Sequence, residues 1–390
     1  MLRPRTRSLH RIVRFAITAL VVAAGACATR ARPDTVPVPV PALEEISSSL
    51  ILIGDAGAPD PRGEPVFQAL KSNIADRDVE TIVVFLGDLL YPRGLPDTGA
   101  VDRAEGERRL AAQADVVTGT DARAILLPGN HDWAKGGEGG WQSVLREQAF
   151  IGNYGNPRVE YLPGDGCPGP AVRDVGTHLR VIVLDTQWLL HGGPKPVDSA
   201  PPCATDASGG WVARLRSALA AAGERHVAVV SHHPLRSTGP HGGHFPWTDH
   251  IFPLRAVKKW LWVPLPVLGS IYPLSRKWGI SSQDEPSGEY RALIDTLEQA
   301  FAEHRPLIYA AGHEHVLEIL EGEAARFLLV SGAGYYGHTS PVGWRDETRF
   351  AASESGFLRI DVLTSKRVRL GVWIADETGR AEEAFSMWLE

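Results

Sequence analysis

Polar side chains able to hold metal ions follow several short apolar runs along the chain. Asp55, Asp88 and Asn130 come just after such runs in the first half, and His232 and His313 follow two more in the second half. Carboxylate, amide and imidazole groups form a ligand set for hard to borderline cations. A carboxylate can bridge two cations, and a pair about 3.5–4 Å apart can clamp a phosphoryl or acyl group for hydrolysis. The pattern therefore indicates hydrolytic metal chemistry.

The segments that carry these residues alternate between strand-like and helix-like patterns from residue 46 onward. Short apolar runs predict strands over 50–53, 81–86, 124–127, 179–185, 227–230 and 307–310. Helices are predicted over 65–77, 102–117, 211–222 and 288–303, and further strands over 316–321, 326–330, 356–362 and 367–374. This alternation indicates a mostly parallel sheet covered on its faces. Chemistry in such sheets collects in the loops that leave the strand C-termini, where the polar residues stand.

The order of the polar blocks resembles a known family. The blocks are Gly-Asp-x-Gly, Gly-Asp-x-x-Tyr, Gly-Asn-His-Asp, Val-x-x-His and Gly-His-x-His. Over residues 50 to 340 this order is similar to the calcineurin-like metallophosphoesterases, and within them to the purple acid phosphatases. The wider superfamily has a ligand histidine where this chain has Gly57, and the purple acid phosphatases supply a tyrosine instead, which matches Tyr91. The resemblance implies an α/β fold in which a two-sheet β-sandwich is flanked by helices, in αββα layers.

The resemblance also implies a binuclear metal centre. One ion would be held by Asp55, Asp88, Tyr91 and His315, and the other by Asp88, Asn130, His232 and His313. Asp88 would bridge the two ions. A tyrosinate adds a hard anion, so the implied pair is Fe(III) with Fe(II), Zn(II) or Mn(II).

Two histidines are expected beside the substrate by the same resemblance. His131 directly follows the ligand Asn130, and His241 stands nine residues after His232, as in the family. Both would stabilise charge on the phosphoryl oxygens, and one would protonate the leaving group.

Three polar neighbours of these residues have separate interpretations. His233 and His244 are further candidates for contact with substrate. Asp132 is expected to orient a neighbouring group rather than to bind metal.

Together these residues predict an exported acid phosphatase-like phosphomonoesterase that hydrolyses a phosphate ester with a metal-bound hydroxide. A bound cation lowers the pKa of water far enough for hydroxide to exist near neutrality. Two alternatives stay open: a phosphodiesterase or nucleotidase that uses the same site, and a non-catalytic surface lipoprotein that binds a partner. The formal net charge of −6 argues against nucleic acid as a partner.

The N-terminal segment has the pattern of an export signal. Five arginines precede a 12-residue apolar stretch over 15–26, which is too short to span a bilayer comfortably. Small residues directly before Cys27 resemble a bacterial lipobox, so residues 1–26 are predicted to be removed and Cys27 to be lipidated. We expect a cell-envelope lipoprotein at the outer membrane or the periplasmic face. A plain secretory signal and an uncleaved anchor are the alternatives.

The rest of the chain divides into a tether and one domain. Residues 27–45 are predicted to form a proline-rich, lipid-anchored tether, and residues 46–390 a metallophosphoesterase domain with the aromatic-rich insertion described below. Export to an oxidising compartment makes Cys167 and Cys203 a disulfide pair, with two unpaired thiols as the alternative. Such a bond would close a loop of about 35 residues and contribute on the order of 3–4 kcal/mol.

One segment has no counterpart in the family. Residues from about 245 to 284 hold four tryptophans, and they lie between the His232 and His313 blocks, where they are expected to form a wall of the site. The simpler interpretation is a long loop that folds over the body and buries its aromatic rings. The alternative is a flap that touches a membrane or an amphiphilic substrate, because aromatic side chains beside basic ones suit the depth of lipid headgroups.

Overall fold

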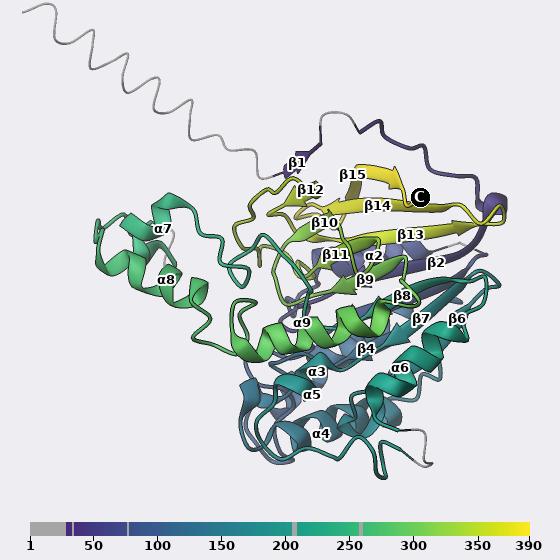
Figure 1. The fold of residues 1–390 in the computed structure, drawn as a ribbon, viewed down its shortest axis with the longest axis horizontal. Helices are drawn as coiled ribbons and strands as arrows, with labels where there is room; N and C mark the ends of the chain where they lie inside the picture. The colour runs from purple at the N-terminus through teal and green to yellow at the C-terminus, as the bar shows by residue number, and fades with distance from the viewer. Residues whose placement is uncertain (1–28, 33–34, 76–77, 205–208, 257–259) are drawn as a thin grey trace, which may run out of the picture.

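A computed structural model describes residues 29–32, 35–75, 78–204, 209–256 and 260–390 (Figure 1). The predicted signal peptide and Cys27 lie outside these residues. Within the described ranges, no helix is both long enough and apolar enough to cross a membrane.

Two mixed β-sheets pack face to face at the centre of the molecule (Figure 1). The first sheet has the order β1 (Thr29–Ala31), β12 (Thr348–Ala352), β10 (Leu317–Glu321), β11 (Phe327–Ser331), β9 (Ile308–Ala311), β8 (His226–Val230), β7 (Leu179–Val183) and β6 (Ala171–Val175). The second has the order β15 (Ala381–Trp388), β14 (Val368–Ala375), β13 (Gly356–Leu363), β2 (Ile46–Ile53), β3 (Glu80–Leu86), β4 (Arg123–Leu127) and β5 (Val159–Tyr161).

Helices cover both outer faces of this sandwich. The second sheet is covered by α2 (Pro65–Ile74), α3 (Arg103–Ala114) and α4 (Gly140–Asn153). The first sheet is covered by α6 (Trp211–Ala220) and α9 (Gly288–Phe301), with the short α5 (Thr186–Leu190) beside them. The αββα architecture implied by the family resemblance is therefore confirmed.

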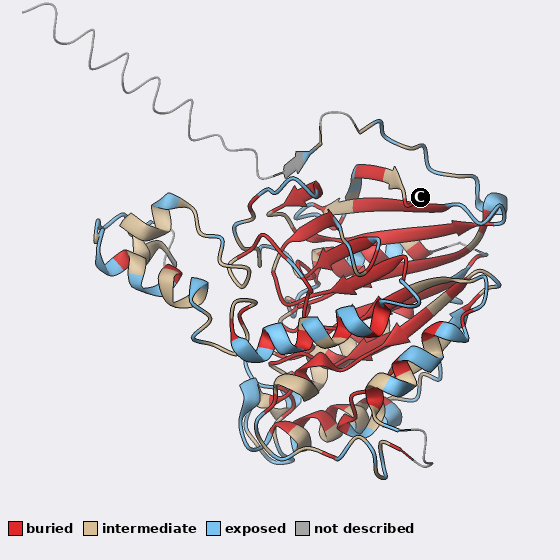
Figure 2. Ribbon diagram, in the orientation of Figure 1, coloured by how far each residue is buried: buried red, intermediate tan, exposed pale blue. Residues whose placement is uncertain are grey.

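The layers follow from the alternation of side chains along each strand. In β2, Leu50 and Leu52 point into the core between the sheets, whereas Ile51 and Ile53 pack under the helices of the second sheet. Both sets are buried, as Figure 2 shows for the central strands of both sheets. A strand buried on both faces reads as a continuous apolar run, which is why these strands could be predicted from sequence.

The prediction of one mostly parallel sheet is wrong, because two sheets form and each mixes strand directions. Strands β2, β3, β4 and β5 run parallel in one sheet, and β7, β8, β9 and β11 run parallel in the other. Antiparallel strands extend both sheets on the side formed by the C-terminal part of the chain. Apolar runs do not encode strand direction, so the sequence pattern could not reveal this division.

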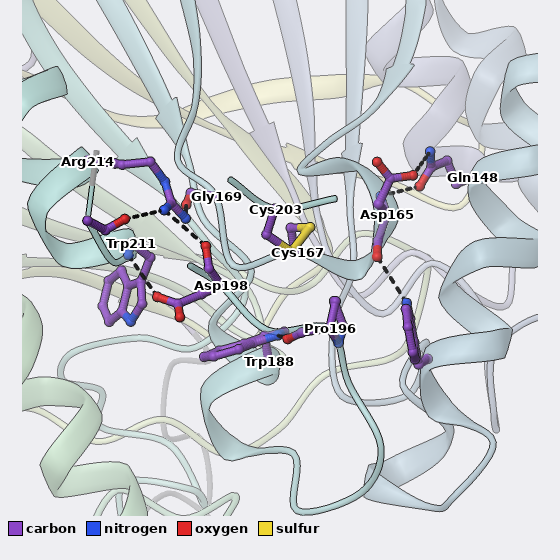
Figure 3. The surroundings of a disulfide bond; sticks show 12 residues. Gln148, Asp165, Cys167, Gly169, Trp188, Pro196, Asp198, Cys203, Trp211 and Arg214 are labelled. Atoms are coloured by element: carbon purple, nitrogen blue, oxygen red, sulfur yellow. Dashed lines mark hydrogen bonds between the residues drawn. A yellow bond between two sulfur atoms is a disulfide. The ribbon is translucent and has the colours of Figure 1, made fainter. Parts of the chain in front are cut away.

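The predicted disulfide between Cys167 and Cys203 is present, with a Cα–Cα distance of 5.4 Å. Figure 3 shows that the loop it closes is also held by polar contacts with α6. The Trp211 backbone N–H donates to the Asp198 carboxylate at 2.9 Å, and the Arg214 guanidinium donates to the carbonyl of Gly169 at 3.1 Å. The crosslink therefore fixes a loop that packs over the helical layer.

The described part of the predicted tether runs along the domain. Strand β1 pairs with β12, so that Thr29 lies opposite Ala352. Further on, the Val38 carbonyl accepts hydrogen bonds from Arg369 at 2.6 Å and from Ser386 at 2.9 Å. A single 3₁₀ turn, η1 (Leu43–Glu45), then leads into β2.

The aromatic-rich segment forms a small lobe that projects from the body (Figures 1 and 2). Its helical parts are α7 (Trp247–Ile251), η5 (Pro253–Ala256), η6 (Leu268–Ser270) and α8 (Ile271–Lys277). The expectation that its rings are buried against the body is wrong, because Trp247, Trp260 and Trp278 are about 70% exposed (68%, 71% and 70%). We call residues 245–282 the aromatic lobe.

Candidate metal centre

The predicted ligands come from the C-terminal ends of parallel strands in both sheets. Asp55 and Asp88 follow β2 and β3, and His232 and His313 follow β8 and β9. Because the two sheets pack face to face, these strand ends meet at one edge of the sandwich.

Three of these ligand positions have an unusual backbone conformation. Asp55, Asp88 and His313 have φ angles of +57°, +51° and +70°. Residues other than glycine rarely adopt this left-handed conformation, which costs of order 1–3 kcal/mol and occurs mainly where a site requires it. The strand ends are therefore bent sharply so that their side chains turn towards one another.

Glycines let the loops approach each other closely. A Cβ atom at Gly129 would collide with the backbone of Asp88, and one at Gly312 would lie 2.5 Å from Oδ2 of Asp55. A Cβ at Gly57 would lie 2.5 Å from the carbonyl oxygen of Asp88. A histidine at position 57 would therefore not fit this backbone, which agrees with the ligand exchange inferred from the sequence.

The first group of candidate ligands consists of Asp55, Tyr91 and His315. They offer a carboxylate oxygen, a phenol oxygen and an imidazole nitrogen to a cation. The Tyr91 hydroxyl lies 3.1 Å from Asp55 Oδ1 and 3.3 Å from His315 Nε2. His315 Nε2 lies 3.5 Å from Asp55 Oδ1. Burial and the charges of Asp55 and Asp88 raise the pKa of Tyr91 well above its usual value. Without a cation, the phenol is therefore protonated.

The second group of candidate ligands consists of Asn130, His232 and His313, whose acceptor atoms face one another. Asn130 Oδ1 lies 2.9 Å from His232 Nε2 and 3.1 Å from His313 Nδ1, and the two nitrogens are 3.3 Å apart. The other ring nitrogens are 2.8 Å from backbone carbonyls, His232 Nδ1 from Leu86 and His313 Nε2 from Gln283. Since a carbonyl can only accept, those nitrogens carry the protons and the facing nitrogens carry lone pairs.

The second group therefore fits a cation. Burial and neighbouring imidazoles lower the pKa of His313 well below its usual value, so the ring is neutral as a metal ligand must be. Lone pairs at such distances repel unless a positive charge lies between them. With the protons on the outer nitrogens, each facing atom is an acceptor, and these atoms form no hydrogen bond with one another.

Asp88 lies between the two groups. Its Oδ1 atom is 3.4 Å from His232 Nε2 and accepts the His131 backbone N–H at 2.9 Å. Suitable ligand atoms of Asp55, Asp88 and His232 all lie within 4.8 Å of one another and are buried. Asp88 would therefore be the residue that holds both cations of a binuclear centre.

The two predicted substrate-facing histidines are oriented alike. His131 Nδ1 is 2.8 Å from the Pro92 carbonyl, and His241 Nδ1 is 2.9 Å from the Gln283 carbonyl and 3.1 Å from Asp284. In both rings Nδ1 donates its proton to a backbone carbonyl, so Nε2 is the nitrogen that is available to the metal site. The His131 Nε2 atom lies 3.8 Å from Asp88, and the His241 ring centroid is 3.9 Å from that of His313. Burial lowers the pKa of both rings.

The other polar candidates lie near the site but have separate roles. His233 can be grouped geometrically with His232 and His313 as a possible metal ligand. Both of its ring nitrogens are bonded instead, to Thr186 Oγ1 at 2.8 Å and Gln283 Oε1 at 2.9 Å, so we do not assign it as a ligand.

The structure also places the two remaining candidates. His244 is exposed and its ring lies against Gly343. Asp132 accepts hydrogen bonds from the backbone amides of Gly129, Leu89 and Leu90 at 2.7, 3.1 and 3.0 Å. It therefore ties together the two loops that carry Asp88 and Asn130.

Several residues of the site were missed by sequence reasoning. Gln283 and Asp284 lie just after the aromatic lobe and hold His313, His241 and His233. Glu314, between two ligands, accepts the backbone N–H of Gly242 at 3.0 Å, and burial raises its pKa to about 8. In the sequence, Glu314 could have been identified only by its position inside the Gly-His-x-His block.

His338 was also missed, because it belongs to none of the sequence blocks. Its ring centroid lies 3.9 Å from that of His315, and its ring stacks on Tyr335 at 4.5 Å. Burial lowers the pKa of His338 to about 3, so the ring is neutral. It packs over the first group of ligands.

A cavity of about 670 Å³ opens beside the ligands. Its lining includes His241, His313 and His315 together with residues of the aromatic lobe. The lobe contributes Phe245, Asp249, Arg255, Tyr272 and Arg276. The lobe therefore forms a wall of the site, as the sequence predicted.

The family model of the calcineurin-like phosphoesterases matches residues 49–317. The chain therefore belongs to the calcineurin-like phosphoesterase family, and it is a metal-dependent phosphoesterase. Comparison with curated protein sequences gives no significant match.

Solved structures share the fold at low sequence identity. GAP50, described as the anchor in the inner membrane complex of Plasmodium, is 14% identical with a TM-score of 0.53, over 89% of each chain. The purple acid phosphatase PPD1 from yellow lupin (Lupinus luteus) seeds is 13% identical with a TM-score of 0.53, over 90% of this chain. The match spans 55% of the lupin protein.

Removing the carboxylate of Asp88 should empty both metal positions. We expect Asp88→Ala to lose both ions, whereas Asn130→Ala should lose mainly the ion of the second group. Elemental analysis of purified protein measures this directly. The matched control is Asp121→Ala, because the Asp121 side chain is 84% exposed and pairs with Arg158 at the surface. A fully metallated Asp88→Ala protein would contradict the bridging role.

Proposed function

We propose that the chain is an exported, acid phosphatase-like phosphomonoesterase with a binuclear metal centre. The observation that carries this proposal is the pair of ligand groups that share Asp88, with the free nitrogens of His131 and His241 beside them. Two bound cations would supply a nucleophile near neutral pH and neutralise charge on the phosphate.

The two histidines would act on the phosphoryl group and on the leaving alcohol. Each ring keeps its Nδ1 proton on a backbone carbonyl, so Nε2 is the atom that can hold or release a proton. Because burial lowers the pKa of both rings, the protonated form gains population only as the pH falls. A protonated Nε2 can pass its proton to the leaving oxygen, which supports activity at acidic pH.

The nature of the first metal is inferred from Tyr91. Its raised pKa means that the phenolate forms only if a strongly charged cation displaces the proton. A trivalent ion does so better than a divalent one, which supports Fe(III) in the first position. Fe(II), Zn(II) or Mn(II) suits the second position, which offers one amide oxygen and two imidazoles besides Asp88.

Two other functions use the same scaffold. A phosphodiesterase or nucleotidase is compatible with the cavity of about 670 Å³, which leaves room for a large alcohol. The fold shared with GAP50, described as an anchor, fits a non-catalytic surface protein. The intact ligand groups and the two oriented histidines favour an enzyme, because a binding scaffold has no use for them.

We also propose that the chain is a lipoprotein of the cell envelope, anchored through Cys27. The basic segment, the short apolar stretch and the small residues before Cys27 support this. The disulfide between the other two cysteines agrees with an oxidising compartment.

Replacing His241 should separate metal binding from hydrolysis. We expect His241→Ala to keep both metals and to lower kcat for a phosphate monoester by about 10²–10³-fold, the loss typical of one transition-state contact. Steady-state kinetics on metal-analysed protein tests this. His226→Ala is the control, because that ring bonds to the carbonyl of Lys366 away from the site. Unchanged kcat in His241→Ala would remove this residue from catalysis.

Tyr91→Phe should change the colour of the protein. A phenolate on Fe(III) gives a charge-transfer band in the visible region, and the substitution removes only the hydroxyl oxygen. We expect violet or pink wild-type protein and a colourless variant. Tyr335→Phe is the control, since its ring lies nearby, with its centroid 6.3 Å from that of Tyr91. Colourless but fully active wild type that contains only zinc or manganese would contradict the iron assignment and leave the hydrolase proposal standing.

Cys27→Ser should release the protein from the membrane. The substitution removes the thiol that would carry lipid, so the variant should partition into the aqueous phase of a detergent extraction while wild type enters the detergent phase. Ala28→Ser, which keeps the thiol, serves as the control. Equal partitioning of wild type and Cys27→Ser into water would contradict lipidation.

A further inference from the structure

The aromatic lobe concentrates the exposed apolar surface of the molecule. Among the described residues, ten of the 17 large hydrophobic side chains that are exposed lie in this lobe. They are Trp247, Trp260, Trp262, Val263, Val267, Leu268, Ile271, Tyr272, Trp278 and Ile280. Apolar surface gathered in this way marks a contact site rather than ordinary surface.

The lobe is packed internally and does not depend on the core of the body. The Arg255 guanidinium lies 4.0 Å from the centroid of Trp262, and the Leu265 amide donates to the Ile251 carbonyl at 2.7 Å. None of its described residues belongs to the hydrophobic clusters that hold the sheets and helices together. The exposed rings of the lobe therefore lie outside the hydrophobic core of the body.

The charge of the lobe is opposite to that of the whole chain. Residues 245–282 contain five lysines or arginines and one aspartate, whereas the chain carries a formal charge of −6. Tryptophan and tyrosine beside basic residues match the headgroup region of an anionic bilayer. A second copy that met this one lobe to lobe would bring two basic surfaces together, so a symmetric contact through the lobe is less complementary than an anionic bilayer.

The described chain begins beside the cavity that the lobe helps to form. Thr29 pairs with Ala352, and the next residue, Ser353, lines the cavity together with Phe245 and Tyr272 of the lobe. The two residues from Cys27 to Thr29 can span at most about 7 Å. A lipid on Cys27 would thus enter a membrane close to the lobe and the site.

We propose that the aromatic lobe docks on an anionic bilayer and, together with the lipid on Cys27, presents the metal site to phosphate esters at that surface. This proposal rests on the proposed function for its substrate, but not for the docking itself. The base of the lobe continues into the site, because Arg276 forms an ion pair with the buried Asp284 at 2.7 Å and Asp284 contacts His241. The surface that meets the bilayer is thus joined directly to the catalytic wall.

The test is vesicle flotation of residues 27–390 with Cys27→Ser, so that no attached lipid contributes to binding. We expect binding to phosphatidylethanolamine vesicles that contain about one quarter phosphatidylglycerol, and much weaker binding to pure phosphatidylcholine. Combining Trp247→Ala, Trp260→Ala and Trp278→Ala should lower the partition constant at least about tenfold, because apolar burial drives interfacial binding. Lys277→Glu should lower it about fivefold or more, and only on the anionic vesicles.

Two controls separate docking from catalysis and from folding. Trp344→Ala removes an exposed tryptophan outside the lobe and should bind vesicles as the parent does. The triple tryptophan variant should hydrolyse a small soluble aryl phosphate at the parent rate. If vesicles bind but no ester is hydrolysed by either protein, the proposed function fails and the docking stands.

Three results would overturn the docking proposal. The first is that the parent fails to bind either kind of vesicle. The second is that the triple tryptophan variant binds as tightly as the parent. The third is concentration-dependent self-association of the parent that the triple variant abolishes, without vesicle binding, which would identify a second copy as the partner.

Discussion

Repulsion among buried lone pairs is the constraint that the rest of this structure has to meet. Asn130 Oδ1, His232 Nε2 and His313 Nδ1 face one another at 2.9 to 3.3 Å without a proton between them, and the carboxylates of Asp55 and Asp88 are buried beside them. Buried acceptors and charges are costly unless they are paired. Cations are the natural partners for this set, and the scaffold must hold the ligands in position for them.

The scaffold meets this constraint with several layers of support. The sandwich brings the ends of parallel strands from both sheets to one edge, and left-handed backbone at Asp55, Asp88 and His313 turns the side chains inward. Backbone carbonyls of Leu86 and Gln283 then fix which nitrogen of each ligand histidine faces the site. Because Gln283 directly follows the aromatic lobe, the same segment that walls the cavity also orients the ligands.

The strands next to the ligands could be predicted from the sequence because they are buried on both faces. A strand such as β15 could not, since its exposed and buried residues alternate irregularly at a sheet edge. Helix α4 was missed because it begins with Gly140, has no side-chain cap and is stabilised by packing on the second sheet. The division into two sheets came from the family resemblance, because apolar runs do not record pairing direction.

The candidate ligands could be proposed from the sequence because each follows a strand within a few residues. The residues that hold those candidate ligands could not be predicted, because Asp284 and His338 reach the site through long-range packing that leaves no local sequence pattern. The exposure of the lobe could not be read from its composition either. Aromatic residues are found in cores and on binding surfaces alike, and only the structure shows that Trp247 and Trp278 are exposed.

Anomalous X-ray diffraction from crystals of the purified protein would locate the metal ions. Two metal peaks about 3.5–4 Å apart are expected at the edge of the sandwich. One should lie beside Tyr91 and His315 and the other beside His232 and His313, with the Asp88 carboxylate touching both. A single peak, or two peaks that do not share Asp88, would contradict a binuclear centre bridged by Asp88.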